Sequence, residues 1–258
     1  HLFDLARTNA EINFKNNLEL IYKDEDRTIN ALKSLGDILN IPNLSVIEAF
    51  DNSNLFGSYT VSAMVTFIDG KPSKNDYRKF KISTDKNDDV GSMKEVIYRR
   101  YQSVLLNKTR KPDLILVDGG INQINACKEV LNSLNLCIKV CGLMKDDKHT
   151  LSKLVDGDTL NEYNIDRKSN VFYLLTRISD EVHRFTINYH RQIRSKGSIE
   201  SVLDKVNGIG PARRKELLKK YGSIKKIREA SLEELNEILP QSVAKELLDF
   251  LKMGSEKN

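Results

Sequence analysis

The stretch KPDLILVDGG, residues 111–120, decides the fold that this sequence predicts. Four consecutive apolar residues, Leu114 to Val117, follow the turn-forming pair Pro112-Asp113, which is the pattern of a strand buried on both faces. Asp118 therefore lies at the carboxyl end of that strand, the edge where open α/β sheets collect ligands and catalytic groups. The alternative is an aspartate that only caps the next helix, so the choice depends on which other side chains reach this edge.

The composition is that of an ordinary globular protein, with 258 residues, 40% of them apolar and 30% charged. This length allows one large domain and a small one. No apolar run is long enough to cross a bilayer and no signal peptide pattern is present, so we expect no membrane association and a cytoplasmic location. The net charge of +5 is too small to indicate a nucleic-acid partner by itself.

The three cysteines, Cys127, Cys137 and Cys141, have neither the even number of a disulfide framework nor the spacing of a zinc site. They are interpreted as small buried apolar side chains. The chain starts at His1 instead of Met, which indicates a piece of a longer protein.

The first part of the chain predicts a helix and then three antiparallel strands. The helix ends before Ile41-Pro42, and its face toward the next domain carries Ile29, Leu32, Leu35, Ile38 and Leu39. The strands are expected at 43–50, 60–68 and 77–82, with a hairpin turn at Asp69-Gly70 and a loop at 85–89. The first strand is expected to end at Asp51, where the polar cluster Asp51 to Asn54 starts a turn.

The next part alternates helices and strands. Helices are expected at 92–106, 123–134 and 170–189, strands at 114–117 and 138–143, and a hairpin at 151–165. Three antiparallel strands, helix, strand, helix, strand and a closing helix form the order of an RNase H-like mixed five-stranded sheet flanked by helices. In that architecture the first and fourth strands are neighbours, so Asp51 and Asp118 would face each other.

The last part changes to short helices after Ser195 to Ser198, which are predicted to form a flexible linker. The glycine-bracketed turn NGIGP, residues 207–211, is typical of a helix-hairpin-helix motif, in which backbone N–H groups bind a DNA phosphate. Nine Lys or Arg residues against the single Glu216 lie between Lys205 and Arg228, which favours contact with a DNA duplex over a merely solvated surface. A second unit follows at 232–251, but its turn has no glycine, so its phosphate contact is in doubt.

The chain resembles a known family in several separated blocks that occur in the family's order. The blocks are FDNSN at 50–54, PDLILVDGG at 112–120, GLMKDDKH at 142–149, DEVHRF at 180–185 and NGIGPARRK at 207–215. From about Ser45 to the end, these residues are similar to the C-terminal half of UvrC, the nuclease of bacterial nucleotide excision repair. The chain departs from the family's pattern at Asn54, often His, and at Ile121, often Lys.

The resemblance implies a function and a domain organisation. Residues 1–43 would be an N-terminal helical segment, 44–194 an RNase H-like endonuclease domain that makes the incision 5′ to a lesion, 195–198 a linker, and 199–258 a tandem helix-hairpin-helix domain. The implied partners are damaged double-stranded DNA, UvrB, whose docking segment lies outside this chain, and indirectly UvrA.

The resemblance also implies site residues. The family's catalytic Asp, Asp and His correspond to Asp51, Asp118 and His183, and Lys145 corresponds to a further polar position near them. The implied DNA-binding residues of the hairpin are Gly208, Gly210, Arg213, Arg214 and Lys215.

The residue types fit metal-dependent phosphodiester hydrolysis. Carboxylate oxygens suit Mg²⁺ or Mn²⁺, and a neutral imidazole suits Mn²⁺ better, so Asp51, Asp118 and His183 are the candidate ligands. His183 either binds the metal or orients the water. Asp180 and Glu181 also flank the histidine, and at helical spacing they can instead pair with Arg177 or Arg184.

Two other functions stay open from the sequence alone. A catalytically inactive RNase H-like module would bind DNA while its carboxylates were structural. A phosphatase or nucleotidyltransferase acting on small phosphates could use the same acidic strand ends, although such a substrate needs no basic hairpin tail.

Overall fold

The computed structural model describes residues 2–55, 59–82, 88–147 and 150–253. They belong to two compact units, His1–Ile187 and Asn188–Asn258, which are described separately. Most of the loop expected at 85–89, and the residues Lys148 and His149 of the charged loop, lie outside the described residues. Among the described residues, no helix has both the length and the apolar character that crossing a bilayer requires.

The first unit begins with α1 (Leu2–Glu25), the short π-helix η1 (Asp26–Asn30) and α2 (Ala31–Leu39). The predicted apolar face is confirmed at Leu32, Leu35 and Leu39, which are buried. It is wrong at Ile29, which is 57% exposed while Thr28 is buried. A π-helical turn holds more residues than an α-helical turn, and it therefore shifts the register of the stripe.

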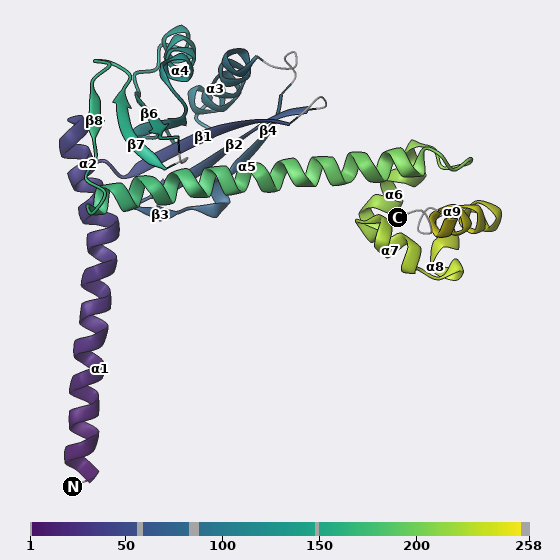
Figure 1. The fold of residues 1–258 in the computed structure, drawn as a ribbon, viewed down its shortest axis with the longest axis horizontal. Coiled ribbons are helices and arrows are strands. Elements are labelled where there is room, and N and C mark those ends of the chain that lie inside the picture. Colours follow the sequence, from purple (N-terminus) through teal and green to yellow (C-terminus); the bar gives the residue numbers. More distant parts are fainter. Residues whose placement is uncertain (1, 56–58, 83–87, 148–149, 254–258) are drawn as a thin grey trace. The chain divides into compact units, whose positions relative to one another are not determined.

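Eight strands form one mixed sheet in the order β3-β2-β1-β5-β6-β7-β8, with β4 also paired to β2 (Figure 1). Their bounds are β1 (Val46–Leu55), β2 (Tyr59–Ile68), β3 (Lys71–Pro72), β4 (Arg78–Lys81), β5 (Leu114–Asp118), β6 (Lys139–Lys145), β7 (Leu151–Asp156) and β8 (Glu162–Asn164). The predicted RNase H-like sheet is its centre, β4-β2-β1-β5-β6. The expected number of five strands is wrong, because the short β3 and the hairpin β7-β8 extend the ladder.

Strand β1 is longer than predicted. The sequence places a turn at Asp51, but Asp51 to Leu55 continue the antiparallel ladder with β2, from Asp51 opposite Ala63 to Leu55 opposite Tyr59. A polar cluster usually ends a strand, and here the pairing with β2 overrides that local preference. Only the parallel pairing with β5 stops near this point, at Phe50 opposite Val117.

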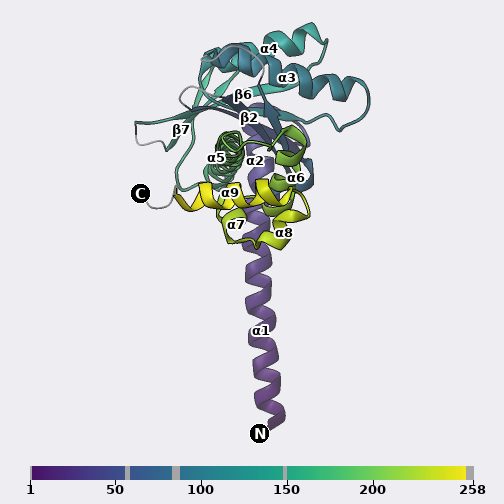
Figure 2. The ribbon, with the colours of Figure 1, turned by 90° about the vertical axis from the view of Figure 1, so that its right-hand side faces the viewer.

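Helices cover both faces of the sheet (Figure 2). On one face lie α3 (Asp89–Leu105) and α4 (Ile121–Ser133), and on the other lie α2 and the first part of α5 (Asn170–Leu203). Alternation along β1 sends Ile47 and Ala49 toward α2 and α5, and Phe50 toward α3 and α4. Because β5 is buried on both faces, its four apolar residues are continuous in sequence.

Helix α5 continues through the residues predicted as a linker, which corrects that expectation. Ser195 to Ser198 are helical, and the boundary between the two compact units falls inside α5, after Ile187. A glycine inside a helix costs only about 1 kcal/mol relative to alanine, so Gly197 weakens the helix without ending it. Composition alone therefore did not separate a flexible linker from a polar helix.

The cysteines also differ from the prediction in one case. Cys127 and Cys141 are buried, whereas Cys137 is exposed. It lies in the connection between α4 and β6, which the apolar core does not cover.

The second unit contains the end of α5 and four short helices, α6 (Pro211–Tyr221), α7 (Ile224–Glu229), α8 (Leu232–Asn236) and α9 (Gln241–Met253). Ser223 and Ser231 cap α7 and α8 through their side chains, and Gly222 ends α6 in the left-handed conformation. Their buried side chains form one small core, which includes Leu203, Leu217, Ile227, Leu235 and Leu247.

A buried ion pair joins the sheet to α3. The Arg100 guanidinium donates to both carboxylate oxygens of Glu48, and Tyr101 donates its hydroxyl to the same carboxylate at 2.8 Å. Both charged side chains are almost inaccessible, 8% and 2% exposed. Burial raises the pKa of Glu48, and Arg100 opposes that shift. Loss of either partner would therefore leave the other charged group buried without compensation.

Replacing Arg100 by Met should destabilise the first unit by about 3–5 kcal/mol, because the Glu48 carboxylate stays buried without its partner. The measurement is urea unfolding followed by circular dichroism. The control is Lys94→Met on the same helix, which removes an exposed ion pair with Glu129 and should cost less than about 1 kcal/mol. Equal losses in the two variants would show that the Glu48–Arg100 pair has no special role.

Candidate metal centre and DNA-binding hairpin

Two aspartates meet at one edge of the sheet because β1 and β5 run parallel side by side. Phe50 pairs with Val117, so the next residue of each strand, Asp51 and Asp118, lies at the same level. Each aspartate follows an apolar residue of the opposite face, and both therefore point toward the α5 side.

The histidine comes from α5, which packs on this face of the sheet. Asp51, Asp118 and His183 each offer one ligand atom, and these three atoms lie within 4.8 Å of one another. The His183 Nδ1 atom is 3.4 Å from Asp51 Oδ2. The side chains differ in access, since Asp51 is 10% exposed and His183 is 58% exposed. The group thus has a buried carboxylate at its base and an imidazole open to solvent.

The environment of Asp51 disfavours its charge. Burial raises the pKa of this carboxyl first, and repulsion from the Asp118 carboxylate raises it further. The nearby Thr186 hydroxyl and His183 act in the opposite direction. Asp51 Oδ2 is buried and has no hydrogen-bond partner among the described residues. A buried oxygen without a partner is costly unless a cation or a proton satisfies it.

Asp118 has a fixed partner. Lys145, at the end of β6, donates its ammonium to Asp118 Oδ2 at 2.5 Å. The register of β6 against β7 shifts between Met144 and Lys145, and such a bulge changes where the side chain points. The helix-capping alternative for Asp118 is not found, because Gly120 is the N-cap of α4 and no side chain caps it.

The Glu181 carboxylate binds side chains outside the candidate metal centre. It accepts a hydrogen bond from the Tyr77 hydroxyl at 3.0 Å and pairs with Arg184 at 2.7 Å. Neither Glu181 nor Asp180 belongs to the group of possible ligands found among the described residues. The structural interpretation of Glu181 is therefore the correct one.

The loop after β6 has an ion pair of its own. Asp146 pairs with Arg167 at 3.2 Å and accepts a hydrogen bond from the backbone N–H of Thr150.

Thr186 is a site residue that the sequence analysis missed. It lies one helical turn after His183 and is fully buried, and its hydroxyl donates to the Val182 carbonyl at 2.8 Å. The spacing of three residues from His183 is the only sequence signal for it, and such a threonine is usually unremarkable on a buried helix face.

The donor set fits a divalent metal ion. Two carboxylates and an imidazole are ligands for Mg²⁺ or Mn²⁺, and the partnerless Asp51 Oδ2 is the atom that gains most from a cation. With Lys145 counted, the four side chains sum to about one negative charge when His183 is neutral. So small a charge favours one weakly held ion.

The predicted hairpin in the second unit has the expected backbone. Gly208 has φ of +86° and Gly210 is the N-cap of α6, with Pro211 at its first position. A β-carbon on Gly208 would lie 2.9 Å from the Val243 side chain. Both the positive φ and this close approach therefore favour glycine at this position. The hairpin surrounds an open hollow of about 610 Å³.

The three predicted basic residues of the hairpin have different environments. Lys215 is exposed, and Arg213 donates to the Gly208 carbonyl at 2.8 Å. Arg214 instead pairs with Asp204. Spacing along a helix cannot show such a pairing, because Asp204 lies in the turn after α5.

The net charge of the chain lies in the second unit. Residues 188–258 contain 15 Lys or Arg and 10 Asp or Glu, whereas residues 1–187 contain 26 of each.

The glycine-free second turn lies between α8 and α9, and Leu239 there is buried in the small core. The helices of this second hairpin therefore complete the small core, as predicted.

The family model of the UvrC RNAse H endonuclease domain matches residues 36–187, more than half of the chain, and a SAM-like helix-hairpin-helix tandem matches residues 200–253. The catalytic domain of human Endonuclease V is 10% identical over 58% of this chain and 84% of its own length, with a TM-score of 0.32.

Endonuclease V of Ciona intestinalis, in complex with an inosine-containing 24mer DNA, is 11% identical. The match covers 69% of this chain and 99% of that chain, with a TM-score of 0.37.

Replacing Asp51 by Asn should raise the thermal midpoint of the metal-free protein at neutral pH, by about 2–4 °C per kcal/mol gained. The pKa of Asp51 is higher in the folded state, so its charge costs stability once the pH exceeds the folded pKa, and this cost disappears below the unfolded value near 3.9. The measurement is thermal unfolding in EDTA at neutral and acidic pH.

The matched control is Asp180→Asn, an exposed carboxylate on the same helix as His183. Added Mn²⁺ should raise the midpoint of the unchanged chain and of the control, but not that of Asp51→Asn. A loss of stability in EDTA at neutral pH would contradict the electrostatic account of Asp51.

Proposed function

Because this chain belongs to the family of the UvrC RNAse H endonuclease domain, we propose that it makes the incision 5′ to a lesion in damaged duplex DNA during bacterial nucleotide excision repair. The family assignment makes it a nuclease with a helix-hairpin-helix tandem. The observation that supports the chemistry is the convergence of Asp51, Asp118 and His183 at one edge of the sheet.

The proposed cofactor is Mg²⁺ or Mn²⁺, held by Asp51 with Asp118 and His183 as further ligands. Bound there, the divalent ion would activate a water molecule and neutralise charge on the phosphodiester. Asp51 is the principal ligand in this proposal, because its buried Oδ2 has no hydrogen-bond partner among the described residues.

The other side chains have separate tasks in this proposal. Lys145 holds Asp118 in one orientation through its ion pair and offsets the repulsion between the two carboxylates. His183 is the most exposed member, so its imidazole either completes the ligand set or orients the attacking water on the DNA side. Thr186 donates its hydroxyl to the Val182 carbonyl within α5 and lies close enough to Asp51 to lower the pKa of that carboxyl.

DNA binding by the second unit supplies most of the affinity in this proposal. The N-terminus of α6 presents backbone N–H groups beside Gly208 and Gly210, and Lys215 and Arg213 add positive charge. Arg214 is reassigned to a structural ion pair with Asp204. Within excision repair the partners are UvrB and, through it, UvrA, and the location is the cytoplasm; the family assignment supports both.

Replacing Asp118 by Asn should reduce nicking by more than about a hundredfold while DNA affinity stays nearly unchanged, because a metal ligand is lost and no charge contact with the DNA is expected. The measurement is nicking of a lesion-bearing duplex already cut on the 3′ side, with Mg²⁺ or Mn²⁺ present. Asp180→Asn is the control and should retain full activity. Nicking that survives in Asp118→Asn, or that needs no divalent ion, would favour an inactive DNA-binding module with the activity elsewhere.

Replacing Lys215 by Gln should weaken duplex binding uniformly across sequences and reduce the salt slope of the binding constant by about one. Arg214→Gln should change the salt slope less and lower the thermal midpoint of the second unit, since it breaks the pair with Asp204. Fluorescence anisotropy at several salt concentrations measures the first effect, and calorimetry measures the second. The reverse order of the two variants would return Arg214 to the DNA contact.

A further inference from the structure

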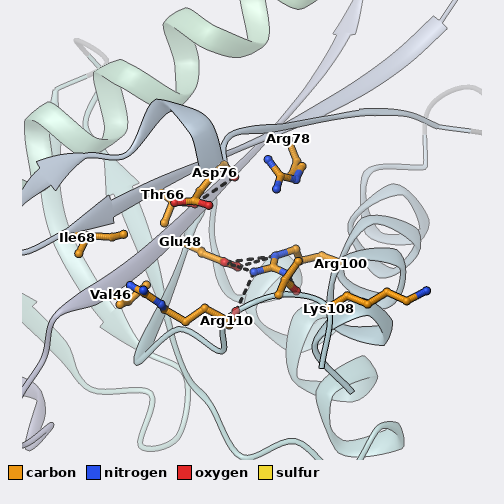
Figure 3. Close-up of a pocket in the computed structure, with 10 residues that line it drawn as sticks. Val46, Glu48, Thr66, Ile68, Asp76, Arg78, Arg100, Lys108 and Arg110 are labelled. Carbon is orange, nitrogen blue, oxygen red and sulfur yellow. Dashed lines mark hydrogen bonds and ion pairs between the residues drawn. The ribbon is translucent and has the colours of Figure 1, made fainter. Parts of the chain in front are cut away.

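A polar pocket lies on the face of the sheet opposite the candidate metal centre (Figure 3). It has a volume of about 260 Å³ and is lined by even-numbered residues of β1 and β2, by the start of β4 and by the loop after α3. Val46 and Glu48 of β1 belong to it, and alternation along β1 turns Asp51 to the other face. The proposed nuclease reaction therefore makes no use of this pocket.

The floor of the pocket is the buried Glu48–Arg100 pair, and its hydrogen-bonding capacity is fully used. Arg100 donates to Glu48, to the hydroxyls of Ser103 and Thr109, and to the Arg110 carbonyl at 3.0 Å. The Glu48 carboxylate also accepts from Tyr101. The floor is thus neutral as a pair, and Arg100 holds the loop that carries Arg110 in place.

The carboxylates of this pocket are not available as a cation site. Glu48 is occupied by Arg100 and Tyr101, and Asp76 accepts a hydrogen bond from the Ser73 hydroxyl at 2.6 Å. A metal ion would have to displace these donors and would face two free guanidinium groups.

The charges at the pocket without an opposite partner among the described residues are the guanidinium groups of Arg78 and Arg110 and the carboxylate of Asp76, so the positive charges exceed the negative by one. Arg78 uses only Nη1, for the Asn75 and Tyr77 carbonyls, which leaves Nε and Nη2 without an acceptor among the described residues. Arg110 has no acidic partner within ion-pair distance in the described part of the chain, and both arginines are exposed. In Figure 3 the Arg110 guanidinium lies beside Val46, whereas the Lys108 ammonium extends to the opposite side, away from Val46 and Glu48.

We propose that this pocket binds a phosphate-bearing ligand, with Arg78 and Arg110 as its cationic contacts. Guanidinium groups match phosphate oxygens in geometry and charge, and they bind such groups better than lysine does. The volume is several times the ~30 Å³ share of one water molecule but below the ~300 Å³ of the smallest drug-sized sites, so it suits a phosphate or a diphosphate group. The phosphate belongs either to a small phosphorylated molecule or to a DNA backbone.

The test is a titration of the full chain with inorganic pyrophosphate by isothermal calorimetry, in EDTA and low salt so that the metal centre takes no part. The unchanged chain should show a saturable pyrophosphate site that Arg78→Gln/Arg110→Gln weakens by at least about tenfold, because two charge-assisted contacts are lost. Lys108→Gln is the matched control on the same loop and should bind like the unchanged chain.

A parallel titration with a labelled duplex identifies the source of the phosphate. If the double variant also loses duplex affinity and its salt slope falls by about two, the ligand is the DNA backbone. If only pyrophosphate binding is lost, the ligand is a small phosphorylated molecule. Pyrophosphate binding that does not saturate, or that is equal in the double variant and the unchanged chain, would overturn the proposal. Nicking activity does not enter these results, so they are independent of the proposed catalytic function.

Discussion

The parallel pairing of β1 with β5 is the constraint on which the candidate site depends. Strands of one direction end at one edge, so the pair Phe50 and Val117 forces the two following aspartates to the same level and the same face. Continuous apolar burial on both sides of β5 leaves no alternative register, because a shift of one residue would move a carboxylate into the core around α3 and α4. The geometry of the chemistry is therefore a consequence of packing.

The same constraint creates an electrostatic conflict that the rest of the site moderates. Two carboxylates brought together at a partly buried edge repel each other, and burial raises the pKa of Asp51 further. The Lys145 ammonium offsets the charge of Asp118, but Asp51 Oδ2 has no hydrogen-bond partner among the described residues. A functional site that is less stable than its surroundings is expected where binding of a cation completes the structure.

Much of this arrangement was predictable because its signals are local in sequence. The apolar run before Asp118 predicts a buried strand, and the alternation of elements predicts the centre of the sheet and the neighbouring positions of Asp51 and Asp118. The missed features depend on tertiary contacts. The pairing with β2 extends β1 through Asp51, and the pair with Asp204 removes Arg214 from the surface charges.

The flexible linker failed as a prediction for a related reason. Ser and Gly weaken a helix without forbidding it, so the composition of residues 195–198 does not decide between coil and helix. The pocket around Arg78 and Arg110 was invisible in the sequence, because its members lie on four separate segments and share no motif. In this first unit acidic and basic residues are equal in number, so its net charge gives no affinity for phosphate. Any such affinity must come from particular arginines that have no acidic partner nearby. In the second unit, affinity for phosphate comes instead from an excess of positive charge, which acts over a longer range and is more sensitive to salt.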